Sequence, residues 1–412
     1  MKRHHEVIVV GGGVIGCAVA YELSKRSVKV LLIDKSLPGR ATSASAGGLW
    51  PLGEAVGLGC GVIYHAAAAD AGEQGSADPS HPEALPEAFR EFLVQSNARF
   101  PKLSEELRAR SGVDIEYQPG AGLLFAIYNE SDLAFVEQVA RSMPAEARLD
   151  RLSAEEVGRL EPQLTRDLLG GALLAGEHQV NPMALAEAFK RAAMQLGTEF
   201  RHHVQVTALR RQGQRMLGVE TADGFLPCGW VVNAAGAWAG PLAATAGLSI
   251  PVFPVRGQIV LTESLPRVLN SCLSTSSCYL SQKEHGEVLI GSTTERVGFD
   301  VSVTEDAIRS LCQGACRAVP MLRHVNVKRV WAGLRPGTPD ELPILGPMAG
   351  LEGYINAAGG FRTGIVAAPL TGRVVAQAVI GEPTDVSLHP FSAARFSRQS
   401  LAGQGASHRE GA

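Results

Sequence analysis

The first residues of the chain combine a strand pattern with a helix pattern. Residues 6–10 (EVIVV) are rich in β-branched side chains and predict a buried strand. After a run of glycines, apolar residues recur with helical spacing from Val14 to Leu23, and a second apolar run at 28–33 ends on Asp34. Together these segments predict a βαβ unit with two parallel strands and a right-handed crossover.

Further along, helix-like and strand-like segments alternate and then give way to a strand-rich block. Helical periodicity is found at 87–110, 131–142, 153–160, 182–196, 304–318 and 364–380. Strand-like runs occupy 122–128, 199–208, 216–222, 229–233, most of 252–292, and 325–332. This order predicts an α/β fold, in which a Rossmann-like domain is combined with a discontinuous second domain built on an antiparallel sheet.

The expected Rossmann-like domain comprises 1–65, 153–245 and 330–385, and the expected second domain comprises 66–152 and 246–329. Residues 66–86 are small, polar and proline-containing, which predicts a surface excursion. The aperiodic tail, 397–412, is expected to be mobile.

Composition narrows the class of protein. The chain has 412 residues, 45% of them hydrophobic and 19% charged, with a formal net charge of −3, so it contains enough apolar material for a large core. No basic block suited to nucleic acid and no uninterrupted apolar stretch of about 18 residues is present. The start of the chain has no signal-peptide pattern, and we expect a cytoplasmic protein. The seven cysteines form no CxxC pair, so neither a disulfide framework nor a metal or iron–sulfur site is expected.

The glycines after the first strand carry the clearest chemical signal. Residues 11–16 (GGGVIG) match G-x-G-x-x-G between a predicted strand and a predicted helix. In this motif Gly11 permits the tight turn, Gly13 lets the backbone approach a pyrophosphate, and Gly16 lets helix pack on strand. Asp34, at the end of the second strand, is placed to accept hydrogen bonds from a ribose diol and disfavours a 2′-phosphate. The motif predicts a bound dinucleotide without deciding between FAD and NAD.

Four other segments favour FAD. They are rich in small residues, which suit a flat ring system lying against the backbone, and they occupy 40–50, 231–240, 329–340 and 356–365. Together they resemble the D-amino-acid oxidase and glycine oxidase family of FAD-dependent oxidoreductases, from residue 6 to about 380. Within it, segments 45–64, 177–182, 281–295 and 332–347 are similar to flavin subunits of hetero-oligomeric enzymes: the β subunit of D-hydroxyproline dehydrogenase, the C subunit of hydrogen cyanide synthase and the B subunit of opine oxidase.

The resemblance implies a set of residues for FAD. The first glycine loop would hold the pyrophosphate, the segment after the second strand would line the isoalloxazine, and the start of the last helix would face the flavin pyrimidine. The implied FAD-binding residues are Gly11, Gly13, Val14, Ile15, Gly16, Asp34, Lys35, Thr42, Ser43, Ala46, Gly47, Gly48, Val206, Gly236, Gly360, Arg362, Thr363, Gly364 and Ile365.

The resemblance also implies residues for an amino-acid substrate. Arg335 matches the arginine that clamps the substrate carboxylate, and Tyr279 matches a tyrosine that donates its hydroxyl to the same carboxylate. Arg362 is expected to contact substrate or flavin. Ser277 stands where glycine oxidase has a histidine, which changes the expected shape and polarity of the pocket. Glu54 and Glu341 are weaker candidates for polar groups near the substrate, and Trp50 and His65 receive no role.

The implied reaction is oxidation of the Cα–N bond of an amino or imino acid, with hydride transfer to flavin N5. The favoured substrate is cis-4-hydroxy-D-proline or another D-amino acid, and the alternatives are oxidation of glycine to HCN and CO₂, or of an opine. A non-catalytic flavin-bearing subunit and an NAD-dependent dehydrogenase are the rival classes. The implied partners are an α-type flavoprotein subunit and a small ferredoxin-like subunit, with any membrane association indirect and peripheral, through the complex and the respiratory chain.

Overall fold

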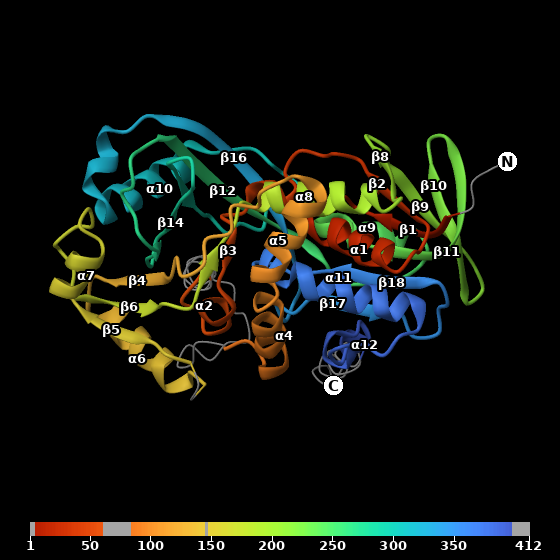
Figure 1. Cartoon of the computed structure of the whole chain (residues 1–412), viewed down its shortest axis with the longest axis horizontal. Helices are drawn as coiled ribbons and strands as arrows, with labels where there is room; N and C mark the ends of the chain where they lie inside the picture. Colours follow the sequence, from red (N-terminus) through yellow and green to blue (C-terminus); the bar gives the residue numbers. More distant parts are fainter. Residues whose placement is uncertain (1–4, 61–83, 145–146, 398–412) are drawn as a thin grey trace, which may run out of the picture.

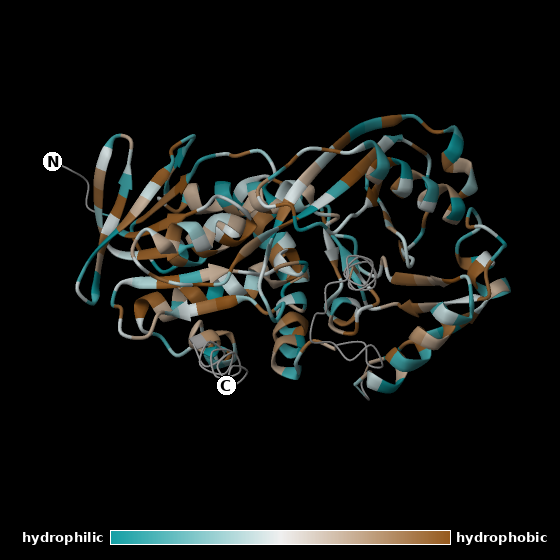
Figure 2. Ribbon diagram, turned by 180° about the vertical axis from the view of Figure 1, so that it is seen from behind, coloured by the Kyte–Doolittle hydropathy of each residue, from teal (hydrophilic) through white to brown (hydrophobic). Residues whose placement is uncertain are grey.

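The computed structural model describes residues 5–60, 84–144 and 147–397, which form two lobes, each built on an eight-stranded sheet (Figure 1). Residues 66–83 of the predicted surface excursion and residues 398–412 of the predicted mobile tail lie outside the described residues. Hydrophobic residues concentrate on the strands and on the inward faces of the helices (Figure 2). The alternation of helix and strand patterns along the chain therefore corresponds to a mixed α/β fold, as expected.

The first sheet is mainly parallel. The parallel strand pairs are β1 with β2, β1 with β11, β11 with β18, and β2 with β8. β17 closes one edge in antiparallel pairing, and β9 and β10 extend from β11. In spatial order the strands are β17 (Ile344–Pro347), β18 (Tyr354–Ala358), β11 (Gly224–Asn233), β1 (His5–Val10), β2 (Val30–Asp34) and β8 (Glu199–His202), with β10 (Arg215–Thr221) and β9 (Val206–Gln212) beside β11.

Helices cover this sheet because its strands are apolar on both faces. One face packs against three helices in a shared core: α1 (Val14–Lys25), α8 (Pro182–Gln195) and α11 (Gly364–Ile380). Beyond them lie α4 (Glu87–Asn97) and α5 (Phe100–Ser111), and the opposite face carries α9 (Ala239–Ala244). The Rossmann-like arrangement predicted from the first 34 residues is thereby confirmed.

The second sheet is antiparallel except for one parallel pair, β4 with β13. On one face α10 (Glu305–Ala318) and α7 (Ala154–Leu160) pack, and on the other α6 (Glu130–Ser142) packs. In spatial order its strands are β16 (Val327–Gly337), β12 (Phe253–Ser264), β15 (Glu287–Gly291), β14 (Tyr279–Gln282), β13 (Cys272–Ser274), β4 (Leu123–Ile127), β6 (Gly170–Leu174) and β5 (Asp150–Ser153).

The sheet membership differs from the expected domain boundaries in two places. β6 (Gly170–Leu174) falls inside the segment 153–245 that we assigned to the Rossmann-like domain, yet it pairs with β4 and β5 of the second sheet. The expected boundary at 330 cuts through β16, which pairs along its length with β12. Both differences arise because strand pairing joins residues far apart in sequence, and the local pattern does not record it.

A short segment joins the two sheets. Arg40 forms a parallel bridge with Leu334 of β16. Gly333 leaves space for a neighbouring methyl group, because a Cβ there would lie 2.2 Å from the Cβ of Ala44. Downstream lie β3 (Gly48–Leu49), paired with β7 (His178–Gln179), and the short helix α2 (Pro51–Ala55). The segment following the first βαβ unit is thus fixed between the two lobes.

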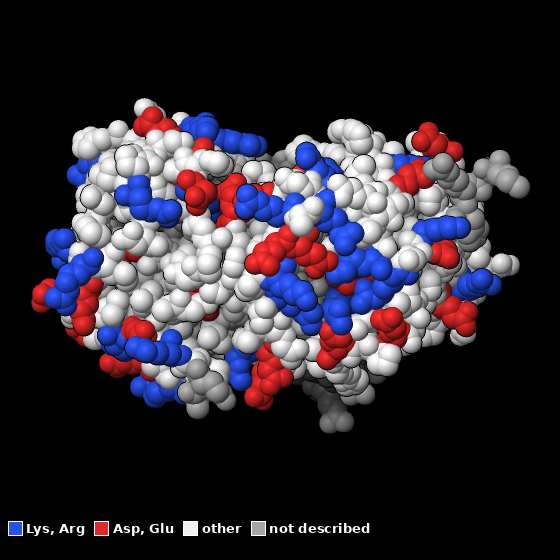
Figure 3. Space-filling model, viewed as in Figure 1, with Lys and Arg blue, Asp and Glu red and all other residues white. Residues whose placement is uncertain are grey.

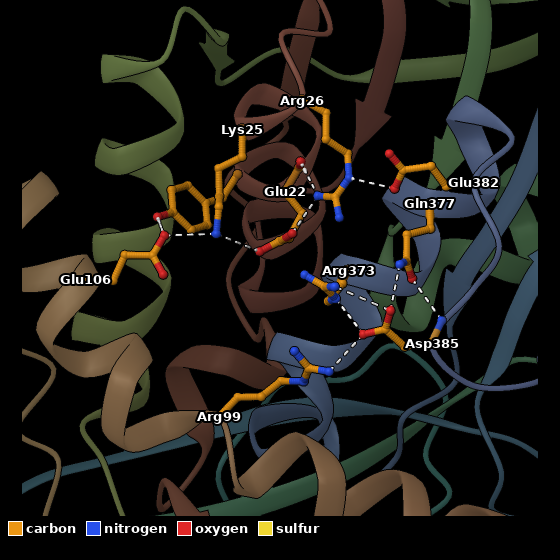
Figure 4. Close-up of polar contacts among 10 residues, drawn as sticks. Glu22, Lys25, Arg26, Arg99, Glu106, Arg373, Gln377, Glu382 and Asp385 are labelled. Carbon is orange, nitrogen blue, oxygen red and sulfur yellow. Dashed lines mark hydrogen bonds and ion pairs between the residues drawn. The ribbon is translucent and has the colours of Figure 1, made fainter.

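Charged side chains gather over the helices of the first lobe, with blue and red atoms intermixed over α1 and α11 (Figure 3). Glu22 accepts hydrogen bonds from Arg26, and Asp385 lies between Arg99 and Arg373 (Figure 4). Asp385 connects the chain after α4 with α11, and Arg26 at the end of α1 also contacts Glu382 after α11. The chain ends, within the described residues, at α12 (Ala394–Ser397). No helix among the described residues is long and apolar enough to cross a membrane.

Candidate active site

One continuous cavity lies where the two sheets meet. Its wall includes Gly11 and Asp34 at the carboxyl ends of β1 and β2, the start of α11, and Tyr279 and Arg335 of the second sheet. In parallel α/β sheets, ligands bind in the crevice beyond the carboxyl ends of the strands. The cavity therefore occupies the position expected for a nucleotide and extends from there to the second sheet.

The glycine loop packs too closely for side chains. Gly11 has φ of +109°, and a Cβ on it would lie 2.3 Å from the carbonyl oxygen of Ala234. A Cβ on Gly16 would lie 1.8 Å from the carbonyl oxygen of Gly11. Gly13 precedes α1 without a side-chain cap, and the N–H of Val14 donates to Thr42 Oγ1 at 3.0 Å. The helix N-terminus therefore faces the cavity with a partial positive charge suited to a pyrophosphate.

Asp34 lies at the end of β2 in the cavity wall. Its Oδ2 accepts a hydrogen bond from the N–H of Gly12 at 2.6 Å, and its Oδ1 accepts one from the N–H of Ser36 at 2.7 Å. Arg40 Nη1 lies 3.1 Å from the same Oδ1. These contacts fix the carboxylate beside the glycine loop, where a ribose hydroxyl pair would be recognised.

A second helix N-terminus faces the cavity at the other side. α11 begins at Gly364, and Thr363 Oγ1 donates to the carbonyl oxygen of Gly360 at 3.0 Å. Gly359 has φ of +79°, and a Cβ there would lie 2.7 Å from Thr338 Cγ2. Since no acidic residue stands in the first turn of α11, its positive end favours negative charge on a bound ring system.

Most of the predicted FAD residues lie in the cavity wall, and four do not. The lining residues are Gly11, Gly13, Val14, Ile15, Asp34, Lys35, Thr42, Ala46, Gly48, Val206, Gly236, Gly360, Arg362, Gly364 and Ile365. The predicted residues that do not line the cavity are Gly16, Ser43, Gly47 and Thr363. Two of the four have other contacts: Gly16 allows α1 to approach the backbone of Gly11 closely, and the carbonyl oxygen of Ser43 accepts a hydrogen bond from Trp331.

Arg335 lies flat along β12 at the end of the cavity that belongs to the second sheet. A Cβ on Gly257 would lie 2.4 Å from Arg335 Nη1, so glycine at that position makes room for the guanidinium. Nη1 donates to the carbonyl oxygen of Thr293 at 3.1 Å, and Nη2 donates to the hydroxyl of Ser292. Within the described residues, no carboxylate lies within ion-pair distance of Arg335. Its positive charge is held by uncharged oxygens and faces the cavity.

Tyr279 stands beside Arg335. It is 2% exposed, and a Cβ on Gly291 of the neighbouring strand would lie 2.4 Å from its hydroxyl oxygen. Burial raises the pKa of the Tyr279 hydroxyl, and the positive charge of Arg335 only partly opposes that effect. The hydroxyl therefore stays protonated at neutral pH and can donate a hydrogen bond.

Arg362 also lines the cavity, but its charge is already neutralised. Arg362 Nε donates to Glu54 Oε2 at 3.1 Å, and Nη2 lies 2.9 Å from Glu341 Oε2. The side chains of Arg362 and Glu54 are each 5% exposed. Burial opposes the charged form, yet the two carboxylates raise the pKa of Arg362. The structure thus brings the three predicted substrate residues together in one cavity wall. The two arginines differ in their partners: Arg362 faces two carboxylates, and Arg335 faces none among the described residues.

Two residues without a predicted role also belong to this site. Trp50 lies in the cavity wall, edge-on to the ring of Tyr279. Lys283 is partly buried behind the wall, where its Nζ donates to the carbonyl oxygen of Ala46 and, at 2.9 Å, to Ser281 Oγ. Burial lowers the pKa of Lys283 to about 8. Local sequence gives no signal for either, because both positions depend on contacts between distant segments.

Fold and cavity have the form of a nucleotide-binding protein, with a glycine loop in one lobe and, in the other, an arginine whose described partners are uncharged oxygens. The chain belongs to the family of FAD-dependent oxidoreductases, whose model (DAO, FAD dependent oxidoreductase) matches residues 6–378. It is therefore an FAD-dependent oxidoreductase, as the resemblance implied.

Individual relatives show which members of this family the chain resembles. The chain is 48% identical to hydrogen cyanide synthase subunit HcnC of Pseudomonas aeruginosa over 96% of this chain and 97% of that one. It is 32% identical to glycine oxidase of Geobacillus kaustophilus over 96% of this chain and 98% of that one. The crystal structure of glycine oxidase from the same organism superposes with a TM-score of 0.83 at 30% identity, covering 95% of this chain and 99% of that one.

Proposed function

We propose that this protein is the glycine-oxidising flavin subunit of a hydrogen cyanide synthase. The proposal takes up the alternative that the sequence left open and replaces cis-4-hydroxy-D-proline as the favoured substrate. The support comes from the 48% identity to subunit HcnC along almost the whole chain and from similarity to several glycine oxidases. Conversion of glycine to HCN and CO₂ removes four electrons and four protons, so the site completes two successive two-electron oxidations.

The observation that carries the proposal is the position of Arg335. Its guanidinium faces the FAD cavity, is fixed by the oxygens of Ser292 and Thr293, and has no carboxylate partner among the described residues. A guanidinium binds a carboxylate through two parallel charge-assisted hydrogen bonds, which set both distance and angle. Arg335 therefore offers a site for the carboxylate of an amino acid, and Tyr279 adds a hydroxyl donor next to it.

The positively charged ammonium group of an amino-acid substrate also has a complementary charge in the site. Arg362 with Glu54 and Glu341 carries one excess negative charge, and Glu54 lies in the cavity wall. Arg335 and this acidic cluster together match the carboxylate and ammonium groups of an amino-acid zwitterion. A non-catalytic electron carrier has no use for such a pair of charges.

FAD, when bound, accepts a hydride equivalent from the substrate carbon. The chain itself supplies position and electrostatics: Arg335 and Tyr279 hold the carboxylate, and the N-terminus of α11 stabilises negative charge at the cofactor end of the cavity. By holding the carboxylate, Arg335 sets the orientation of the substrate α-carbon within the cavity.

The partners are part of the proposal. HcnC is by name a subunit of a synthase, and we infer that this chain also works within a hetero-oligomer. An α-type flavoprotein subunit and a small ferredoxin-like subunit remain the partners implied by the resemblance. Electrons would leave through them to the respiratory chain, and any association with a membrane would follow from that complex.

The test is anaerobic absorbance of the FAD-loaded protein mixed with glycine, sarcosine, D-proline, cis-4-hydroxy-D-proline and an opine. Glycine is expected to bleach the oxidised flavin band at about 450 nm, and the co-expressed complex is expected to release cyanide from glycine. Bleaching by the proline analogues but not by glycine would overturn the proposal in favour of a hydroxyproline dehydrogenase. A flavin in the co-expressed complex that no amino acid reduces would overturn the catalytic role altogether.

A further inference from the structure

Trp50 occupies a fixed position in the cavity wall. It follows β3, whose Gly48 and Leu49 pair with β7, and it precedes Pro51, the first residue of α2. The backbone is therefore held on both sides of the residue. The side chain is 2% exposed and contributes to the wall of the FAD cavity.

The indole lies between the cofactor-facing segment and the carboxylate anchor. On one side a Cβ on Gly48 would lie 2.4 Å from Trp50 Cε2, so the ring rests directly against the backbone of that segment. On the other side the rings of Trp50 and Tyr279 have centroids 6.0 Å apart and an interplanar angle of 77°. This edge-to-face contact is favourable for aromatic pairs and holds the indole in one orientation.

This location adjoins the part of the cavity wall that holds Tyr279 and Arg335. The α-carbon of an amino acid lies about 1.5 Å from its carboxylate carbon, so a carboxylate on Arg335 and Tyr279 places the α-carbon close to both. Gly48, in the segment that the resemblance implies for the isoalloxazine, lies in the same cavity wall. A substituent on the α-carbon would therefore meet the wall that Trp50 forms between Gly48 and Tyr279.

We propose that Trp50 restricts this site to an α-carbon that carries no side chain, and so selects glycine. The inference rests on the proposed function and deepens it by assigning the residue that sets substrate size. Because Gly48 and Tyr279 pack against both sides of the indole, the ring cannot swing aside to admit a larger substrate without breaking these contacts.

The test compares Trp50→Ala and Trp50→Phe with the unchanged FAD-loaded chain. Isothermal titration calorimetry measures the binding of acetate and of pyrrole-2-carboxylate, which cannot be oxidised by the site in the same way as an amino acid. Anaerobic flavin reduction measures kcat/KM for glycine, D-alanine and cis-4-hydroxy-D-proline. Trp230→Ala, on β11 and outside the cavity wall, is the matched control for loss of a tryptophan.

Trp50→Ala is expected to raise the D-alanine to glycine ratio of kcat/KM by about 10- to 200-fold, the range for one methylene-sized group in a pocket. The pyrrole-2-carboxylate to acetate binding ratio is expected to rise at least about tenfold. Trp50→Phe is expected to give a smaller change in the same direction, and Trp230→Ala none. Trp50→Phe keeps the test decisive if Trp50→Ala does not fold.

Unchanged ratios in both Trp50 variants would overturn the proposal, as would equal binding of the two carboxylates by the unchanged protein. Failure of the proposed function looks different. In that case glycine would not reduce the flavin even in the co-expressed complex, while the two carboxylates would still bind, and their binding ratio would still decide the role of Trp50.

Discussion

Arg362 donates its Nε–H to the carboxylate of Glu54 at 3.1 Å, across 308 positions of the chain. Both side chains are buried and both line the cavity in which Arg335 has no carboxylate partner among the described residues. This pairing leaves Arg335, and not Arg362, available to a substrate; the third arginine of the cavity wall, Arg40, is paired with Asp34. It also leads to predictions that separate the roles of the two side chains.

Replacement of Arg335 by Leu is expected to lower kcat/KM for glycine by about 30- to 1000-fold, corresponding to about 2–4 kcal/mol of lost transition-state binding. The reason is that Arg335 lies in the cavity wall beside Tyr279 and has no carboxylate partner among the described residues, so its charge is available to the substrate. Steady-state kinetics at matched FAD content measures the effect. Arg329→Leu, an exposed position on the same strand, is the control. Equal activity of the two variants would remove Arg335 from the site.

Replacement of Arg362 by Met is expected to destabilise the protein by about 3–5 kcal/mol, because two carboxylates lose the cation between them. The measurement is the urea midpoint at pH 7. The triple variant Arg362→Met, Glu54→Gln, Glu341→Gln is expected to recover at least about half of this loss, since it leaves no unpaired charge. If the triple variant were less stable than Arg362→Met, the charge network would not be the cause.

The lowered pKa of Lys283 predicts that the stability of the protein changes with pH in the alkaline range. Its pKa is lowered to about 8 by burial, so between about pH 8 and the unfolded pKa of about 10.4 the unfolded chain binds more protons than the folded one. Stability therefore gains a contribution as pH rises through this window. Chemical unfolding measures the free energy of unfolding of wild type and of Lys283→Met. The wild-type value minus the variant value is expected to increase by up to about 3 kcal/mol between pH 7 and 10. A difference that is independent of pH would contradict the lowered pKa of Lys283.

Asp385 predicts a dependence of the same sign at acid pH, where stability again rises with pH. Hydrogen bonds from Arg373 and Gln377 and the charge of Arg99 lower its pKa to about 2. The stabilisation is complete above the unfolded pKa of about 3.9 and is lost as pH falls through about 2. Because the ion pairs lie near the surface, Asp385→Asn is expected to cost only about 1 kcal/mol at pH 7, and less in 1 M salt.

The control for Asp385 is Glu382→Gln, at a half-exposed carboxylate that contacts Arg26 in the same region. Its effect on the thermal midpoint is expected to be smaller than that of Asp385→Asn at every pH. Equal effects would mean that general surface charge, and not the contacts of Asp385, determines the change.

Local sequence patterns predicted the part of the site formed by the glycine loop and Asp34. The glycine loop and Asp34 lie within 24 residues of one another and belong to one βαβ unit, so strand, helix and carboxylate could be placed together from the sequence. The parallel pairing of β1 with β2 and the position of Asp34 beside Gly12 follow from that unit alone. The resemblance to a known family then supplied Arg335 and Tyr279.

The part of the site around Trp50 and Arg362 depends on contacts between segments that are distant in the sequence. Trp50 was given no role because a tryptophan beside glycines is usually part of the core, and its contact with Tyr279 joins residues on different elements. The charge state of Arg362 was equally hidden, since the sequence does not show that Glu54 and Glu341 converge on it. The placement of β6 in the second sheet also rests on long-range pairing.

The most direct test is a crystal structure of the FAD-loaded protein with glycolate, a carboxylate of the size of glycine. The account predicts that the glycolate carboxylate lies within hydrogen-bond distance of Arg335 and Tyr279, with its α-carbon between Trp50 and the flavin and with Arg362 still paired with Glu54. A carboxylate bound at Arg362 instead, with Glu54 displaced and Arg335 untouched, would contradict the account.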